Sequence, residues 1–178
     1  MNGNIVPRWN KYFFNPIELN LNDDQRALLK ERFHKSVERG YMYIDPALTT
    51  YYANLEMLEG IYPDYIIQDL DRITTGWGFC TSMGQIPKHV DAQRIACVTI
   101  PIFNDDNVPL EFFDYHDKKI IETLHYGYGT WIHRTKEDHQ VSGKSNTLRV
   151  HLQGDVFAHA FDNLLYEYEE KGLFKPKQ

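Results

Sequence analysis

The sequence predicts a mainly β fold with flanking helices (α+β), built as a jelly roll or a double-stranded barrel. From Ile73 onward, apolar runs shorten to strand length, and Thr, Gly and aromatic residues become frequent. Turn-forming residues separate these runs at short intervals, and the helical patterns lie before and after them. About seven short strands at this spacing, with no internal repeat, are typical of a jelly roll.

The expected strands cover residues 72–82, 93–102, 110–115, 119–126, 129–134, 138–141 and 147–153. Residues i and i+2 of a strand point to the same face. In the second strand Ile95 and Cys97 therefore share one face, and Ala96 and Val98 share the other. Because both faces are apolar, we expect this strand to be buried on both sides.

The first helix has signals at both ends. Asn22 is a suitable N-cap, Gln25 completes a capping box, and Gly40 is a typical stop. The sequence therefore predicts a helix between Asn22 and Gly40. Its apolar face is expected to contain Leu29, Phe33 and Val37.

Three further helices are expected. The second begins at Asp45-Pro46 and ends at Gly60, and the third runs from Pro63 to Leu70. The last begins at Asp155 as N-cap and ends at Gly172. Its buried stripe is expected to contain Phe157, Phe161, Leu164, Leu165 and Tyr168.

The length of 178 residues favours a single domain, 1–178, with a sizeable core. Within it, residues 1–70 form an N-terminal arm and buttress helices, 71–154 the β core, and 155–172 the C-terminal helix. The arm extends to Leu21 and carries Trp9, Tyr12, Phe13 and Phe14. It either packs these aromatics against the core, or acts as a lid or a partner-binding segment.

Composition excludes several classes of protein. A net charge of −6 and a pI near 5.7 are unlike a broad nucleic-acid surface, so no nucleic-acid partner is expected. No apolar run is long enough for a membrane span and the N-terminus lacks the features of a secretion signal, so the expected location is cytoplasmic. Cys80 and Cys97 form no disulfide or zinc pattern and are expected as small buried residues. Nothing in the sequence indicates the oligomeric state.

Two short segments carry the chemistry. His89 and Asp91 flank Val90, and His139 follows about fifty residues later. Arg149 lies ten positions after His139, within an apolar run. Two imidazoles and one carboxylate can hold one face of an octahedral metal, as in non-haem Fe(II) oxygenases. Taken singly, each of these side chains also fits an ordinary surface or capping residue.

On these residues the sequence resembles the 2-oxoglutarate/Fe(II)-dependent dioxygenases, especially the branch of aspartyl/asparaginyl and proline hydroxylases. The resemblance extends from Gly76 to Asp162. It implies a double-stranded β-helix, or cupin-like, core. It also implies Fe(II) held by His89, Asp91 and His139, with 2-oxoglutarate as cosubstrate and O₂ as oxidant.

Four other residues are candidates for binding the cosubstrate. Arg149 has the planar fork that suits the distal carboxylate of 2-oxoglutarate, with an internal ion pair as the alternative. His151 shares its strand face and is either a hydrogen-bonding partner or a core histidine. Arg94 contacts a carboxylate in the site, as the resemblance implies, or forms a surface salt bridge. Trp131, like Thr99, lines the pocket or simply packs in a strand.

Two further histidines, His125 and His133, are alternatives for the distal metal ligand. We prefer His139 because only His139 precedes the Arg-bearing strand at the interval typical of the family. His34 and His116 are expected at the surface.

The resemblance implies a hydroxylase that oxidises an amino-acid side chain, free or within a peptide, and releases succinate and CO₂. Two alternatives stay open: a non-catalytic cupin-like binding module, and a cupin-type metalloenzyme that does not use 2-oxoglutarate. The chain has few elements outside its core and helices, which favours a small molecule or a short peptide loop as substrate.

Overall fold

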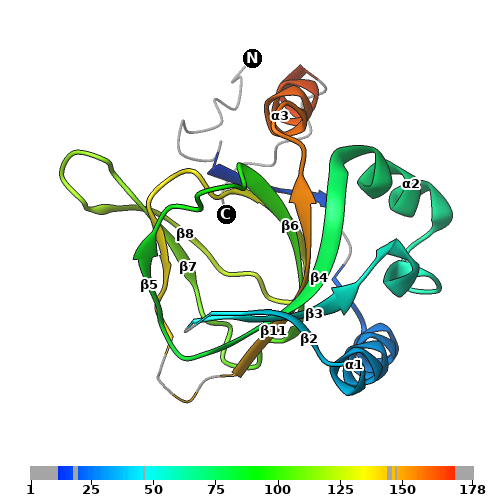
Figure 1. The fold of residues 1–178 in the computed structure, drawn as a ribbon. Helices are drawn as coiled ribbons and strands as arrows, with labels where there is room; N and C mark the ends of the chain where they lie inside the picture. Colours follow the sequence, from blue (N-terminus) through cyan, green and yellow to red (C-terminus); the bar gives the residue numbers. More distant parts are fainter. Residues whose placement is uncertain (1–11, 18–19, 46, 144–145, 147, 171–178) are drawn as a thin grey trace.

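The computed structural model describes residues 12–17, 20–45, 47–143, 146 and 148–170, which form two facing β-sheets with helices outside (Figure 1). All strand pairs in the two sheets are antiparallel among these residues. The sheets curve toward one another (Figure 1), and residues of both sheets line a cavity between them. This arrangement confirms the predicted fold class, mainly β with flanking helices.

The larger sheet has seven strands and the smaller has four. In spatial order the larger contains β1 (Phe13–Ile17), β9 (Thr130–Arg134), β6 (Ala96–Phe103), β11 (Leu148–Val156), β4 (Thr74–Met83), β3 (Thr49–Ala53) and β2 (Tyr41–Ile44). The smaller contains β5 (Ile86–His89), β10 (His139–Val141), β7 (Leu110–Phe113) and β8 (Ile120–Leu124). The seven strands expected from the sequence correspond to β4, β6, β7, β8, β9, β10 and β11. The expectations missed β1, β2, β3 and β5.

Helices cover the outer face of the larger sheet. Helix α1 (Asp23–Glu38), the 3₁₀ helix η2 (Leu55–Leu58) and α2 (Asp64–Ile73) lie on one side in Figure 1, and α3 (Ala160–Glu170) lies beyond the end of β11. Leu29 and Phe33 of α1 are buried against this sheet, whereas Val37 is 36% exposed. The described residues contain no helix with the length and apolar character that crossing a membrane would require.

The ends of α1 form as the sequence predicts. The Asn22 side chain accepts a hydrogen bond from the Gln25 N–H, and the Gln25 side chain accepts one from the Asn22 N–H. These two bonds satisfy donors that the helix itself leaves free. Gly40 has φ of +95°, a conformation that favours glycine and ends the helix.

The helix expected between Asp45-Pro46 and Gly60 is wrong. Residues Thr49–Ala53 form β3, which pairs in register with β4, and only Leu55–Leu58 are helical. β-Branched and aromatic residues dominate β3, and this composition favours a strand. The Asp45 carboxylate accepts hydrogen bonds from the N–H groups of Ala47 and Leu48, at 2.7 Å each. These bonds close the turn between β2 and β3 and do not begin a helix.

The C-terminal helix begins later than expected. Asp155 lies in β11, which continues to Val156, and α3 begins at Ala160. Within the expected stripe, Phe161 is fully buried, Leu164 is partly buried, and Phe157 is 38% exposed before the helix begins. The side chains of Leu165 and Tyr168, and Gly172 itself, lie outside the described residues.

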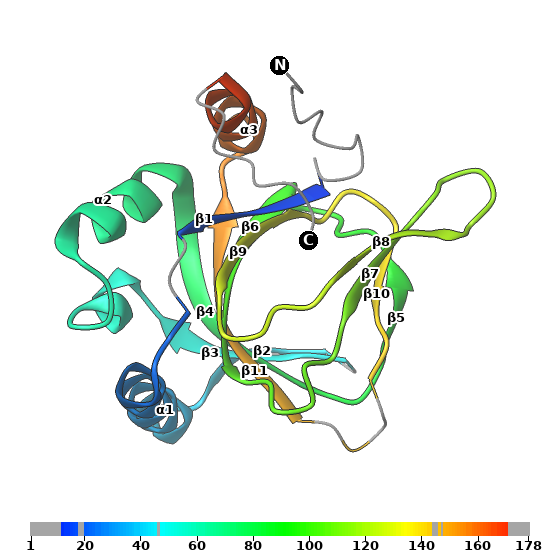
Figure 2. The same cartoon turned by 180° about the vertical axis from the view of Figure 1, so that it is seen from behind.

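The N-terminal arm joins the larger sheet. Strand β1 pairs with β9 at the sheet edge, as the view from behind shows (Figure 2). Tyr12 and Phe13 pack against Phe112 with ring centroids 5.6 and 5.8 Å apart. This contact agrees with the packed form of the arm for these two residues; Trp9 lies outside the described residues, as does the side chain of Phe14.

The two faces of β11 meet different surroundings. Val150 and Leu152 are fully buried in the helix-covered core, whereas Arg149, His151 and Gln153 line a cavity between the sheets. Gly154 lies directly against Trp77, and a Cβ atom at this position would come within 2.7 Å of the indole ring. One strand therefore forms both the apolar core and one wall of the cavity.

Candidate active site

Antiparallel pairing brings the two predicted histidine ligands together. His89 ends β5, His139 begins β10, and the two residues are direct partners across the ladder. Asp91 follows β5 by two residues. One ligand atom from each of the three side chains lies within 4.8 Å of the others, the spacing of a metal site. The described residues contain no second group of this kind.

Backbone carbonyls orient both imidazoles. Nδ1 of His89 lies 2.7 Å from the Pro87 carbonyl oxygen, and Nδ1 of His139 lies 2.8 Å from that of Glu137. When Nδ1–H donates to these oxygens, the Nε2 lone pair of each ring is free to bind a metal. His89 Nε2 lies 3.5 Å from Asp91 Oδ1, so this nitrogen and oxygen face the same point.

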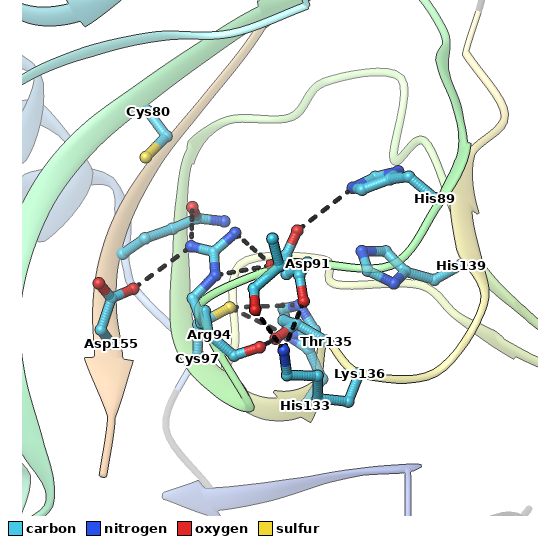
Figure 3. A network of polar contacts seen from close by, with 12 residues as sticks. Cys80, His89, Asp91, Arg94, Cys97, His133, Thr135, Lys136, His139 and Asp155 are labelled. Atoms are coloured by element: carbon cyan, nitrogen blue, oxygen red, sulfur yellow. Dashed lines mark hydrogen bonds and ion pairs between the residues drawn. The ribbon is translucent and has the colours of Figure 1, made fainter. Parts of the chain in front are cut away.

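The second oxygen of Asp91 is held by Arg94. The Nε and Nη2 atoms of Arg94 lie 2.8 and 2.7 Å from Asp91 Oδ2. Figure 3 shows Arg94 between Asp91 on one side and Asp155 on the other. Burial raises the pKa of Asp91, but hydrogen bonds from His89 and the Arg94 charge outweigh it and hold the pKa well below its usual range. Asp91 is therefore ionised, as a metal ligand must be.

A cavity of about 340 Å³ joins this site to β11. Arg149 is 4% exposed and His151 is 5% exposed, and both line the cavity. Arg149 Nε and His151 Nε2 are buried without a hydrogen-bond partner, and the described residues give Arg149 no ion pair. Its Cζ lies 5.9 Å from the Tyr126 ring centroid. The cavity thus holds an unpaired buried cation, which is costly without an anionic ligand.

Burial keeps most of the histidines around the cavity neutral. It lowers the pKa of His133 to about 3, and lowers the pKa of His139 and, much further, that of His151. His89 is the exception, because its hydrogen bond to Asp91 raises its pKa. Neutral imidazoles can bind a metal without first losing a proton.

The structure brings most of the predicted site residues to one cavity. His89, Asp91, His139, Arg94, Arg149 and His151 all line it. Trp131 and Thr99 are not among the lining residues: Trp131 donates to the Tyr126 carbonyl at 2.8 Å and packs on Phe13, and Thr99 contacts Gln153. The structure gives no support to a pocket role for either.

Neither alternative distal ligand joins His89 and Asp91 in the metal-ligating group. His125 is exposed, and its Nδ1 lies 3.4 Å from the Asn107 carbonyl. His133 is buried in the cavity wall, with Nε2 at 3.3 Å from the Cys97 sulfur. Cys97 is fully buried as expected, whereas Cys80 is only partly buried and lines the cavity.

Sequence reasoning missed three parts of the cavity wall. Tyr126 is 3% exposed and lies beside Arg149, but it comes from a loop with no local signal. The turn that contains Asp45 and Leu48 was hidden by the wrong helix assignment. Gln153 was detectable, because it shares the strand face of Arg149 and His151.

Comparison with known proteins shows similarity in structure only. No protein-family model and no curated protein matches the sequence. The structure is similar to a prolyl hydroxylase from Trichoplax adhaerens, solved with a peptide fragment of the hypoxia inducible factor oxygen degradation domain. The TM-score is 0.59 at 10% identity, over 86% of this chain and 87% of that one.

Two further solved structures are similar. A prolyl-4-hydroxylase from Pseudomonas putida has a TM-score of 0.51 at 11% identity, over 82% of this chain and 91% of that one. A non-haem monooxygenase solved with nickel has a TM-score of 0.52 at 13% identity, over 82% of this chain and 74% of that one. The structural neighbours are therefore prolyl hydroxylases and non-haem oxygenases, and the predicted double-stranded β-helix fold is confirmed.

Proposed function

We propose that this chain is a non-haem Fe(II)- and 2-oxoglutarate-dependent oxygenase. It hydroxylates an amino-acid side chain, free or within a peptide, and releases succinate and CO₂. The observation that carries this proposal is the buried guanidinium of Arg149, which has no ion pair among the described residues and lies in the same cavity as His89, Asp91 and His139. Three metal-ligating side chains fit many metalloproteins. A buried cation beside them specifically fits a ligand that binds the metal at one end and carries a carboxylate at the other.

The donor set fits Fe(II). Two imidazole nitrogens and one carboxylate oxygen suit this metal and leave its other coordination positions open for small ligands. When bound, Fe(II) and 2-oxoglutarate supply the O₂-dependent oxidation of a C–H bond. The chain itself contributes orientation, exclusion of water and charge.

Arg149 and His151 bind and orient the cosubstrate. The Arg149 fork pairs with the distal carboxylate, and burial strengthens this charge-assisted bond. The neutral His151 supplies Nε2, an atom that has no hydrogen-bond partner within the described part of the chain. Leu110 and Val141 line the cavity from the smaller sheet, and these apolar walls limit the access of water.

The substrate approaches from the side of His89. The His89 side chain is 38% exposed and Val90 is 44% exposed, whereas His139 is 4% exposed. The metal site therefore opens to solvent at the end of β5, where a side chain of a peptide or a free amino acid can enter. The Trichoplax prolyl hydroxylase was solved with a peptide, which supports a peptide substrate for this chain as well.

Anaerobic titration of the purified protein with Fe(II) and then 2-oxoglutarate tests the proposal. We expect a visible charge-transfer band with the wild-type protein and none with His139→Ala. In air, the wild-type protein is expected to convert 2-oxoglutarate to succinate. A protein that binds Fe(II) but gives neither the band nor succinate would not be a 2-oxoglutarate-dependent oxygenase.

The variant Arg149→Met distinguishes the remaining alternative. A 2-oxoglutarate enzyme with this substitution keeps its metal affinity and loses the band and succinate formation. A cupin-type metalloenzyme that does not use 2-oxoglutarate would remain active. A mass-spectrometric screen of amino acids and peptides for addition of one oxygen atom, dependent on both Fe(II) and 2-oxoglutarate, then identifies the substrate.

A further inference from the structure

Two cations outside the metal-ligating group are directed at Asp91. Arg94 binds the carboxylate through Nε and Nη2, both on Oδ2. Lys136 donates from Nζ to the backbone carbonyls of Asp91 and Ala92, at 2.8 and 2.6 Å. One cation thus holds the side chain and the other holds the main chain of the same residue.

Arg94 leaves Asp91 with one available oxygen. Both Arg94 contacts fall on Oδ2, while Oδ1 is the atom that lies 3.5 Å from His89 Nε2. Arg94 also contacts β11, because its Nη1 lies 3.5 Å from Gln153 Oε1 and from Asp155 Oδ1. The carboxylate is therefore connected to β11, the strand that carries Arg149.

Lys136 connects the Asp91 segment to the segment that carries the second histidine. Thr135 accepts a hydrogen bond from the Asp91 N–H at 2.9 Å, and its hydroxyl donates to the Arg94 carbonyl at 2.7 Å. Three residues after Lys136, the same segment reaches His139. Displacement of Asp91 relative to His139 would break several of these bonds together (Figure 3).

We propose that Arg94 and Lys136 are positioning residues that form a clamp on Asp91 and hold it as a one-oxygen ligand before the metal binds. This inference rests on the proposed function, since it takes His89, Asp91 and His139 as the metal ligands. It assigns Arg94 to the metal carboxylate of the protein, not to a carboxylate of the cosubstrate. Neither residue touches the metal in this assignment.

The direction of the change in metal affinity, when Arg94 or Lys136 is removed, distinguishes a positioning role from a purely electrostatic one. A cation close to a divalent metal repels it, so if Arg94 and Lys136 acted only through charge, removing either would strengthen metal binding. If they position Asp91, removing either gives the carboxylate more freedom and weakens binding. Outer-sphere residues that orient a ligand typically contribute about 10–100-fold to metal affinity.

Binding of Mn(II) to the purified full-length chain, followed by electron paramagnetic resonance, tests the clamp. We expect Arg94→Gln to weaken Mn(II) binding by about 10–100-fold and Arg94→Lys to weaken it less, because Lys keeps the charge but not the fork. Lys136→Met is expected to weaken binding by about fivefold, since it removes the main-chain contacts alone. Lys35→Met is the matched control: Lys35 is exposed and pairs with Glu31, and its loss should leave Mn(II) affinity unchanged.

A second measurement separates the clamp from a cosubstrate role. At saturating Mn(II), the affinity for 2-oxoglutarate is expected to remain that of the wild type in Lys136→Met and Arg94→Lys. Unchanged or tighter Mn(II) binding in the folded variants would overturn the clamp, as would a loss of 2-oxoglutarate affinity alone. Lys136 is at the surface, so its variant carries the test even if Arg94→Gln fails to fold. Absence of Mn(II) binding by the wild-type protein would instead remove the proposed function itself.

Discussion

The two faces of β11 are equally buried but differ in how their polar atoms are satisfied. On the outer face, Val150 and Leu152 have 0% exposure and belong to the hydrophobic core. On the inner face, Arg149 and His151 are 4% and 5% exposed, yet each has a buried nitrogen without a hydrogen-bond partner among the residues that the structure describes. Burial of the first kind stabilises the fold, whereas burial of the second kind costs free energy in the free protein. The difference identifies which face serves a ligand.

The largest expected effect on stability comes from the outer face. Leu152→Ala removes buried methyl groups and leaves a cavity, which is expected to lower the free energy of unfolding by about 3 kcal/mol. Urea denaturation measures this loss. The affinity of the folded variant for 2-oxoglutarate should be close to that of the wild type. A stability change below about 1 kcal/mol would mean that the outer face is not the structural one.

The next largest effect is expected in the pH dependence of the free energy of unfolding, which the buried cavity histidines cause. The pKa of His133 is about 3 in the folded protein and about 6.5 in the unfolded chain, so below pH 6.5 the unfolded chain binds more protons. Burial of neutral His133 therefore leaves the free energy of unfolding undiminished above pH 6.5. As the pH falls from 6.5 toward 3, the free energy of unfolding decreases. Between pH 6.5 and pH 5 it falls by about 2 kcal/mol.

The variant His133→Asn isolates this contribution. His139 and His151 have lowered pKa values and remain in the variant, so its stability still declines in acid, but less steeply than that of the wild type. Urea denaturation of the metal-free proteins at several pH values gives both slopes. Equal slopes would show that His133 is not held neutral by burial.

A smaller effect of opposite sign is expected at Arg149. Because this guanidinium is buried without an ion pair, Arg149→Met removes a desolvation cost and is expected to raise the free energy of unfolding by about 1 kcal/mol. The same change abolishes detectable 2-oxoglutarate binding by calorimetry. A variant that is destabilised, or that still binds 2-oxoglutarate, would contradict the contrast between the two faces of β11.

The smallest effect is expected at Trp131. Its indole donates to the Tyr126 carbonyl and does not line the cavity, so Trp131→Phe is expected to keep 2-oxoglutarate affinity within about twofold of the wild type. Loss of binding in this variant would restore the pocket role that the sequence suggested for Trp131.

The sequence predicted local features correctly more often than features that depend on contacts between distant segments. The capping box at Asn22 and the strand that holds Arg149 and His151 depend on neighbouring residues, and both were predicted. The spacing of His89 and Asp91 places them near one another, which is also a local property. The approach of His139 to His89 is a long-range contact that was inferred from family resemblance. The β5–β10 pairing that produces it was not predicted, because β5 itself was missed.

The failures also have physical causes. Asp45-Pro46 is a helix-start pattern, but the same carboxylate also closes a tight turn, and pairing of β3 with β4 favoured the turn. Asp155 has the residue type of an N-cap, but it extends β11 and faces Arg94. Tyr126 and Lys136 reach the site from loops, and loop paths are set by the whole fold rather than by local sequence.

Gly154 limits how this protein can be redesigned. It lies next to the ladder of cavity-facing residues on β11, and a Cβ atom there would meet Trp77 at 2.7 Å. Trp77 is not free to turn away, because its indole donates to the Thr74 hydroxyl at 3.1 Å. A library that diversifies β11 should therefore keep position 154 as glycine, since a larger residue would shift the strand and every side chain that it presents to the cavity.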